Sequence, residues 1–400
     1  MAWRNLWRNK KRTFITSASV VFAVLLAILL NSLKEGILVK MQENIVSFYT
    51  GAIQVHQNGY WDDQTIDNTF QNNQRILETI RTHENVDAIT PRLESFALTA
   101  SHENSRGSLI VGIDPARESL ITKIDQKVVD GTFLESQDKA AMITLGLSEY
   151  LKLGVGDTII IIGQGFHGVS AAGKYPVKGI IDFVSPQLNK SMVYLPLAES
   201  QQLFGAEDRL SALVVHVENI QDSELTSAQI GNILDDEFEV MSWKILLPEL
   251  DQIIEGERAE NIIFLLVLYM LISFGIFGTI LMMTMERKFE FGVLVAIGMK
   301  KLKLSSVVVF ENILVSLLGA ILGTLLSIPV VGYFYNYPIK VTGDLKEAYE
   351  NYGFEPIFYF SIEPAIFYSQ TLVVLVIALV LSVYPMIKIQ RLDPVTAMRD

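Results

Sequence analysis

Residues 261–285 read NIIFLLVLYMLISFGIFGTILMMTM and contain no charged side chain. An α-helix rises about 1.5 Å per residue, so about 20 apolar residues cross a hydrocarbon core that is roughly 30 Å thick. A helix of this length in the core of a soluble protein rarely stays uncharged on every face. The stretch therefore predicts a helix that spans a membrane.

Three more stretches have the same apolar character, at 13–33, 305–332 and 364–387. Hydrophobic residues make up 50% of the 400-residue chain and charged residues only 19%, which fits a protein with several spans. The apolar part of 13–33 exceeds that of a secretory signal peptide, and no cleavage site of small residues follows before Lys34. We therefore expect it to be retained as the first of four transmembrane helices.

The basic residues gather beside particular ends of these spans. They lie at 4–12, at 287–303 and at 388–399. The positive-inside rule places such segments in the cytoplasm. We therefore expect both termini, the loop 286–304 and the tail 388–400 to be cytoplasmic, in a multi-pass protein of a bacterial inner membrane.

The same orientation places residues 34–260 and the shorter loop 333–363 in the periplasm. The net charge is −12, and no basic stripe lies outside the cytoplasmic segments, which argues against nucleic acid as a partner. The chain has no cysteine, so the domain at 34–260 is held by packing rather than by disulfides. Its length is sufficient for a hydrophobic core of its own.

Local patterns within 34–260 predict a mixture of strands and helices. Alternating or β-branched runs predict strands at 52–56, 96–100, 109–112, 158–162, 175–181, 191–194 and 213–217. Helical spacing predicts helices at 71–82, 197–203 and 224–234. The two kinds do not alternate as in βαβ units, so we expect an α+β domain. The predicted fold is an integral membrane α-helical protein with four transmembrane helices and this large extracytoplasmic domain between helices 1 and 2.

Two segments next to the membrane have helical patterns. In residues 1–12, Trp3 and Trp7 share one helical face and cations share another, which favours an interfacial helix that contacts membrane lipids; a plain topology signal is the alternative. Pro248 is suited to open a helix, which would run into the span 261–285 as a stiff stalk. A simple linker helix is the alternative there.

The sequence contains no pattern typical of a catalytic, cofactor or metal site. The five histidines share no ligand spacing. Residues 168–174 read GVSAAGK and match a phosphate-binding loop, but Tyr175 follows where a Ser or Thr would bind Mg²⁺. We therefore interpret this region as a flexible, exposed loop. Its candidate partner-binding residues are Gly165, Phe166, His167 and Gly168.

The third span has two notable features. Glu311 is either an intramembrane carboxylate, which is costly and often functional, or an interfacial one beside Lys301 or Lys303. Gly319 and Gly323 form a GxxxG pair, which lets helices approach closely. We interpret that pair as helix packing.

The cytoplasmic loop 286–304 reads ERKFEFGVLVAIGMKKLKL and predicts a short helix that Gly298 ends. Its apolar side chains need a partner groove. The loop resembles the coupling helix of FtsX/MacB-type ABC transporter permeases, roughly E-R-x-x-E-[IF]-G-x-L-[RK]-A-[IL]-G-M. The matching residues are Glu286, Arg287, Glu290, Phe291, Gly292, Leu294, Ala296, Ile297, Gly298 and Met299. Val295 replaces the usual basic residue, so a salt bridge made from that position is not expected here.

Other segments carry the same resemblance along the whole chain. They are AWRNLWRNKKRTFIT at 2–16, VVDGTFL at 128–134, LGLSEYLKLGVGDTIII at 145–161 and RLDPVTAMRD at 391–400. The resemblance implies a MacB-like outer domain, a second permease subunit that is identical or homologous, and a cytoplasmic ABC ATPase that docks on the coupling helix. These 400 residues hold no nucleotide-binding domain. We therefore expect ATP and Mg²⁺ to be bound by a separate ATPase, and this chain not to be an enzyme by itself.

The layout is similar to that of the lipoprotein-releasing permeases LolC and LolE. This implies lipoproteins as cargo, handled on the outer side of the membrane, and a periplasmic carrier that receives them. Two alternatives remain at this point. One is an efflux permease for peptides, antibiotics or lipids with a membrane-fusion partner, and the other is an FtsX-like transmembrane regulator of a periplasmic enzyme.

Overall fold

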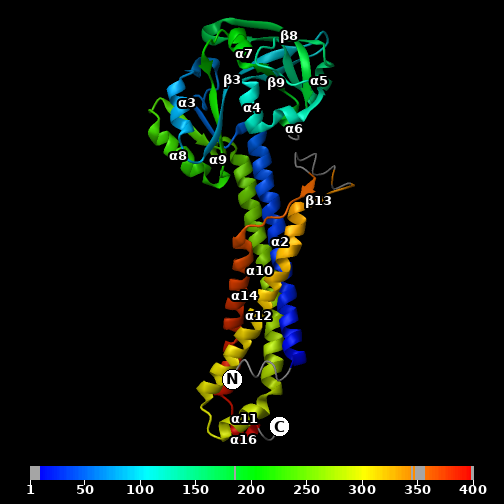
Figure 1. Ribbon diagram of the computed structural model, residues 1–400, viewed down its shortest axis with the longest axis vertical. Coiled ribbons are helices and arrows are strands. Elements are labelled where there is room, and N and C mark those ends of the chain that lie inside the picture. The colour runs from blue at the N-terminus through cyan, green and yellow to red at the C-terminus, as the bar shows by residue number, and fades with distance from the viewer. Residues whose placement is uncertain (1–9, 184–185, 344–345, 347–355, 398–400) are drawn as a thin grey trace. The chain divides into compact units, whose positions relative to one another are not determined.

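The computed structural model describes residues 10–183, 186–343, 346 and 356–397 (Figure 1). The chain forms two compact units. The membrane unit comprises Met1–Val39, Glu255–Lys340 and Ile357–Asp400, and the outer unit comprises Lys40–Ile254 and Val341–Pro356. Most of the interfacial helix that the sequence predicts at 1–12 lies outside the described residues.

Four helices of the described chain are long and apolar enough to cross a membrane. They are α2 (Lys10–Ile45), α10 (Pro248–Glu286), α12 (Lys301–Asn336) and α14 (Pro364–Leu381), which α15 (Val383–Gln390) continues after a break at Ser382. Helix α10 begins at Pro248, so the predicted stalk and the second span belong to one helix. Gly256 does not interrupt it.

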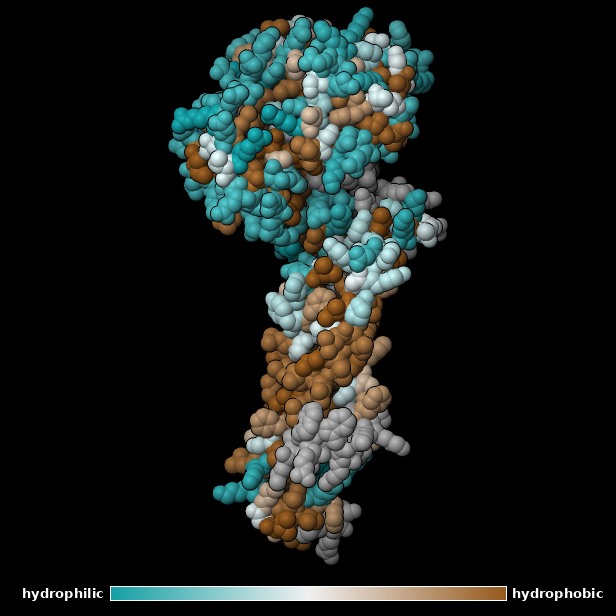
Figure 2. Space-filling view, in the orientation of Figure 1, coloured by the Kyte–Doolittle hydropathy of each residue, from teal (hydrophilic) through white to brown (hydrophobic). Residues whose placement is uncertain are grey.

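The membrane unit has its own apolar core. Side chains of all four helices meet there, among them Val24, Ile276, Ala320 and Val374. Figure 2 shows a continuous hydrophobic surface on the outside of this bundle, as contact with acyl chains requires. A short strand pair, β13 (Ile339–Lys340) and β14 (Ile357–Phe358), lies between α12 and α14 in the chain.

The outer unit contains a closed ring of six strands. In ring order these are β3 (Val86–Ala100), β4 (Ser105–Ile113), β9 (Met192–Pro196), β6 (Ala141–Thr144), β8 (Ser170–Ile181) and β7 (Thr158–Gln164), which returns to β3. Closure removes the exposed sheet edges that promote aggregation. The interior is filled by apolar side chains such as Leu93, Ile110 and Ile161, together with Phe204 of α7 (Leu197–Phe204).

The same sheet extends outside the ring from strand β3. Beyond it the order continues with β11 (Ala212–Val217), β1 (Ile53–Gln57) and β12 (Phe238–Ser242). Helices α3 (Gln74–Arg81), α8 (Ser223–Ile233) and α9 (Trp243–Leu246) contribute Ile80, Ile230 and Trp243 to a core shared with this sheet. The long strand β3 therefore connects two sub-structures within the outer unit.

The remaining elements are short. They are the π-helical turn η1 (Val46–Thr50), η2 (Ile66–Asn68), β2 (Phe70–Gln71), α4 (Pro115–Thr122), η3 (Ile124–Lys127), β5 (Val128–Gly131), α5 (Leu145–Leu151), η4 (Phe166–Gly168), α6 (Pro186–Asn189), β10 (Arg209–Leu210) and η5 (Ile220–Asp222). The α+β class is confirmed, and all seven strands and three helices predicted for this domain are present. The sequence patterns missed β6, β12, α4 and α5, which are only 4, 5, 8 and 7 residues long.

Candidate functional site

The predicted coupling loop forms a compact turn of the membrane unit. Helix α11 (Lys288–Ala296) lies between the end of α10 at Glu286 and the start of α12 at Lys301. We call residues Glu286–Met299 the coupling segment. Its apolar side chains pack on α12, on α15 and on Leu392, which precedes the short helix α16 (Pro394–Ala397).

Arg287 is held at this turn by two carboxylates. Its Nη1 atom donates to both carboxylate oxygens of Glu311, at 3.0 and 2.8 Å, and its Nε atom donates to Glu290 at 3.2 Å. The side chain of Glu311 is only 4% exposed and that of Arg287 13%. The ion pair ties the coupling segment to the interior of α12.

The partner of Glu311 is Arg287 and neither of the two lysines beside which the interfacial alternative placed it. Lys301 lies at the first residue of α12 and donates instead to the backbone oxygen of Gln390, at 3.1 Å. Glu311 follows ten residues later, about 15 Å along the helix axis, beyond the reach of either lysine along the same helix. Arg287 reaches it because the preceding turn folds back against α12.

Some residues predicted to dock on the ATPase are buried within the chain. Phe291 is 2% exposed and packs with Leu304, Val308 and Ile389. Gly292 is buried, and Leu294 and Met299 are partly buried in the same cluster. These residues therefore stabilise the coupling segment from inside and do not form its outer face, because a helix packed on its own unit presents only the opposite side.

The outer face of α11 is formed by other residues. Phe289 is 56% exposed and Ile297 is 75% exposed. Glu286, Ala296 and Gly298 are exposed as well, whereas Glu290 is half-buried. Two large apolar side chains thus protrude from a helix that is otherwise well packed, which is typical of a surface that a partner covers.

Gly298 ends α11 in a Schellman motif. Its φ of +98° is a conformation that side chains with a Cβ rarely adopt. The backbone N–H of Met299 donates to the oxygen of Leu294 at 3.0 Å, and that of Gly298 donates to Val295 at 3.1 Å. The prediction that Gly298 ends the helix is confirmed.

Gly319 and Gly323 lie on the face of α12 that meets α2. A Cβ atom at Gly319 would stand 2.7 Å from Cβ of Val20, and one at Gly323 would stand 2.8 Å from the backbone oxygen of Val21. Both distances are below normal van der Waals contact. The pair therefore allows two helices of the same membrane unit to approach closely.

The predicted partner loop is the anchored tip of the β7–β8 hairpin. Gly165 is buried, and the ring of Phe166 lies 4.3 Å below the guanidinium of Arg209. The N–H of His167 donates to Asp67 at 2.7 Å. These two contacts hold the tip at Phe166 and His167, and the side chains of His167 and Val169 remain exposed on it.

The resemblance to a phosphate-binding loop has no structural counterpart. Residues 170–174 of the motif belong to strand β8 and pair with β7, so they do not form a loop that opens a helix. Among the described residues, no group of three or more His, Cys, Asp or Glu side chains could hold a metal ion. His83 and Asp222 line a small polar cavity, but they do not form such a group.

A buried ionic cluster in the outer unit was not predicted. Arg92 on β3 is 0% exposed; its Nη2 atom lies 2.5 Å from Glu118 of α4, and its Nη1 atom donates to the backbone oxygen of Tyr49 in η1 at 2.6 Å. Burial alone would lower the pKa of Arg92, but the Glu118 carboxylate favours the charged form and the net shift is upward. We call Arg92, Glu118 and the Tyr49 carbonyl the Arg92 brace.

Two family models match the chain and together cover most of it. A MacB-like periplasmic core domain matches residues 13–233, and an FtsX-like permease C-terminal region matches residues 262–394. The first match alone covers more than half of the 400 residues.

Several curated proteins are similar in sequence to this chain. An uncharacterized ABC transporter permease of Methanocaldococcus jannaschii is 26% identical over 211 residues, which are 50% of each chain. The macrolide export ATP-binding/permease protein MacB of Escherichia coli is 22% identical over 100% of this chain and 60% of its own. The lipoprotein-releasing system transmembrane protein LolC of Neisseria meningitidis serogroup B is 22% identical over 84% of each chain.

The chain thus spans 50% and 60% of the length of the first two relatives. The four membrane helices, the outer unit after the first of them, and the two family matches agree with one another. The chain belongs to the FtsX/MacB-type family of ABC transporter permeases.

Proposed function

We propose that this chain is the membrane subunit of an ABC transporter that transmits motion rather than forming a channel. A cytoplasmic ATPase, which binds ATP and Mg²⁺, docks on the coupling segment, and a second permease subunit completes the complex. Both chain termini lie in the cytoplasm. The observation that carries this proposal is the outer face of α11, where Phe289 and Ile297 protrude from a helix fixed to the rest of its unit.

The contacts of the coupling segment provide a path for this motion. Force applied to α11 reaches α12 through the Arg287–Glu311 ion pair, and α15 through the packing of Phe291 on Ile389. Helix α10 ends at Glu286, where the coupling segment begins, and is one uninterrupted helix back to Pro248. A helix of 39 residues, about 58 Å long at 1.5 Å per residue, is a stiff element for carrying a displacement along the chain.

The cargo that we favour is lipoproteins released from the inner membrane. The match to LolC, which covers 84% of each chain, supports this choice. A periplasmic carrier would contact the exposed His167 and Val169 at the tip of the β7–β8 hairpin. Macrolide efflux is the second candidate, because the match to MacB covers 100% of this chain.

The docking site can be tested by cross-linking, because the chain contains no native cysteine. Ile297→Cys, carried by the full chain co-expressed with its ATPase, is expected to cross-link to the ATPase on illumination after labelling with a maleimide that carries a benzophenone group, which inserts into nearby C–H bonds. The matched control is Val129→Cys, which replaces an exposed residue of the outer unit. Equal cross-linking from both positions, or none from Ile297→Cys, would contradict the docking assignment.

The same two variants test the orientation. In spheroplasts, a membrane-impermeant maleimide should label Val129→Cys but not Ile297→Cys, and it should label both after lysis. The cargo is tested in proteoliposomes that contain the complete complex. ATP should release a triacylated lipoprotein to a soluble acceptor, whereas ATPase turnover that responds to a macrolide but not to lipoprotein would favour efflux.

A further inference from the structure

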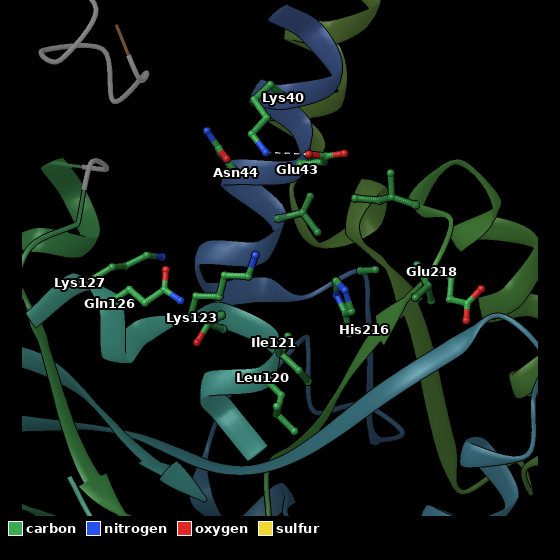
Figure 3. A pocket seen from close by; sticks show the side chains of 15 residues that line it. Lys40, Glu43, Asn44, Leu120, Ile121, Lys123, Gln126, Lys127, His216 and Glu218 are labelled. Atoms are coloured by element: carbon green, nitrogen blue, oxygen red, sulfur yellow. Dashed lines mark hydrogen bonds and ion pairs between the residues drawn. The ribbon is translucent and has the colours of Figure 1, made fainter. Parts of the chain in front are cut away.

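A cavity of about 510 Å³ lies within the outer unit, between the end of α2, helix α4 with η3, and strand β11 (Figure 3). Lys40 and Asn44 of α2 line one wall, and Lys123, Gln126 and Lys127 line another. His216 of β11 lies opposite. Its volume falls within the usual range of roughly 300–1,000 Å³ for pockets that hold small ligands.

Positive charge and amide groups gather on one side of this cavity. Three lysines and two glutamates line it, and Glu43 is already engaged with Lys40 at 3.1 Å. The other glutamate, Glu218, lies on the far side of His216 from the lysines in Figure 3. Lys123 and Gln126 extend into this space in Figure 3, whereas the Nζ atom of Lys127 is buried beside it and lies 5.3 Å from the centroid of the Phe183 ring. The lysine side therefore favours an anion with several acceptor oxygens.

The lining is not uniformly polar. Leu120, which is 70% exposed, and the buried residues Ile121 and Val217 form an apolar part beside the lysines. A free inorganic anion would leave this part unused. A ligand that joins an anionic group to a small apolar body would contact both.

The walls of the cavity are fixed to one another before any ligand binds. Tyr49 of the Arg92 brace follows the wall residue Val46 by three positions, and Glu118 precedes the wall residue Leu120 by two. Arg92 connects the two segments that carry these wall residues: it donates hydrogen bonds of 2.6 Å to the Tyr49 carbonyl and of 2.5 and 3.1 Å to the Glu118 carboxylate. A preformed site lowers the entropy that binding must otherwise lose.

We propose that this cavity binds the phosphoryl group of a small amphiphile. Lys123 donates to the phosphoryl oxygens, the charge of Lys127 beside the cavity adds electrostatic attraction, Gln126 and Asn44 add amide hydrogen bonds, and the apolar part beside Leu120 contacts the glycerol or acyl carbons. A phospholipid headgroup and a soluble glycerol phosphate share this chemistry. The proposal concerns a ligand of the outer unit and stands whichever cargo the transporter moves.

Binding is measured by isothermal titration calorimetry on the purified full chain in a non-ionic detergent. The probes are dihexanoyl-phosphatidylglycerol, glycerol 3-phosphate and dihexanoylglycerol, which lacks the phosphate. The double variant Lys123→Gln/Lys127→Gln should weaken binding of the phosphorylated probes by about tenfold or more, since one charge-assisted hydrogen bond and a second nearby positive charge are lost. Lys123→Gln alone, at an exposed side chain, should weaken it several-fold without affecting folding.

The matched control is Lys139→Gln/Lys152→Gln, which removes the same charge from two exposed lysines that do not line the cavity. It should bind like the wild type. Binding of the phosphatidylglycerol probe alone would identify a lipid headgroup as the source, and binding of both phosphorylated probes would identify the phosphoryl group itself. Equal binding of dihexanoylglycerol, an equal loss in the control, or no binding by either phosphorylated probe would overturn the proposal.

Discussion

The guanidinium of Arg287 donates from one nitrogen to both carboxylate oxygens of Glu311, at 3.0 and 2.8 Å. Arg287 lies at the turn between α10 and α11, and Glu311 lies inside α12. The two side chains are 13% and 4% exposed, so water screens the pair only weakly. The pair therefore connects the coupling segment to a membrane helix by a directional contact.

Glu311→Gln should destabilise the membrane unit by about 3–5 kcal/mol, because it leaves the buried charge of Arg287 without its main partner. The double variant Arg287→Gln/Glu311→Gln should lose less than the sum of the two single variants. These differences in the free energy of unfolding are measured by denaturant titration of the purified full chain in detergent. Arg117→Gln, which breaks a largely exposed pair with Asp114, is the control and should cost at most about 1 kcal/mol.

Gly298→Ala should weaken the coupling of ATP hydrolysis to transport. A residue with a Cβ adopts the φ of +98° found here at a cost of about 1 kcal/mol, so the substitution should also disturb the end of α11. Gly256→Ala is the matched control: Gly256 lies inside α10 with nothing within 4 Å of an added Cβ, so that change should be neutral or slightly stabilising. Transport measured per ATP hydrolysed in proteoliposomes separates the two. The same loss in both variants would argue against a special role for Gly298.

The sequence predicted the elements whose patterns are long. A span such as 261–285 is uncharged over its whole length, and strand 213–217 is almost entirely apolar, so the local signal is strong in both. The motif of the coupling loop also located its helix and the end of that helix at Gly298. Strand β6 escaped prediction because its four residues, Ala141–Thr144, give no period to read.

The partners of buried charges could not be predicted from local patterns. Arg92 and Glu118 are 26 positions apart and Arg287 and Glu311 are 24 apart, and only the tertiary fold brings each pair together. For the same reason the motif could not separate Phe291, which faces inward, from Phe289, which faces outward. Strand β3 carries three charged residues, Asp87, Arg92 and Glu94, and nothing in its local pattern marks Arg92 as the fully buried one.

Gly319→Ala and Gly323→Ala should each destabilise the membrane unit. The added methyl group would press against Val20 in the first case and against the backbone oxygen of Val21 in the second, where α2 must shift to make room. Overpacking of this kind costs about 1–3 kcal/mol. Gly332→Ala on the same helix is the matched control, because nothing lies within 4 Å of a Cβ there. In thermal unfolding measured in detergent, the midpoint temperature should therefore be lower than that of the wild type for Gly319→Ala and Gly323→Ala only.

The ion pair between Asp138 and Lys178 should make the outer unit sensitive to acid. The two groups are 2.5 Å apart, and each side chain is 24% exposed. Partial burial alone would raise the pKa of Asp138, but the hydrogen bonds from Lys178 and from the backbone N–H of Glu135 outweigh it, and the pKa of Asp138 is lowered from its ordinary value. A carboxylate with a depressed pKa contributes stability that is fully present above its ordinary pKa and is lost as the pH falls through the folded value.

Asp138→Asn should therefore reduce stability at pH 7 by about 1 kcal/mol, and the difference from the wild type should shrink below about pH 4 and vanish once the pH falls below the lowered pKa of the native carboxylate. Hydrogen exchange of the amides in β8, measured by mass spectrometry on the full chain at several pH values, reports this locally. A difference that stays constant from pH 7 to the acid end would mean that the aspartate acts through its shape or its hydrogen bond to Glu135, and not through its charge.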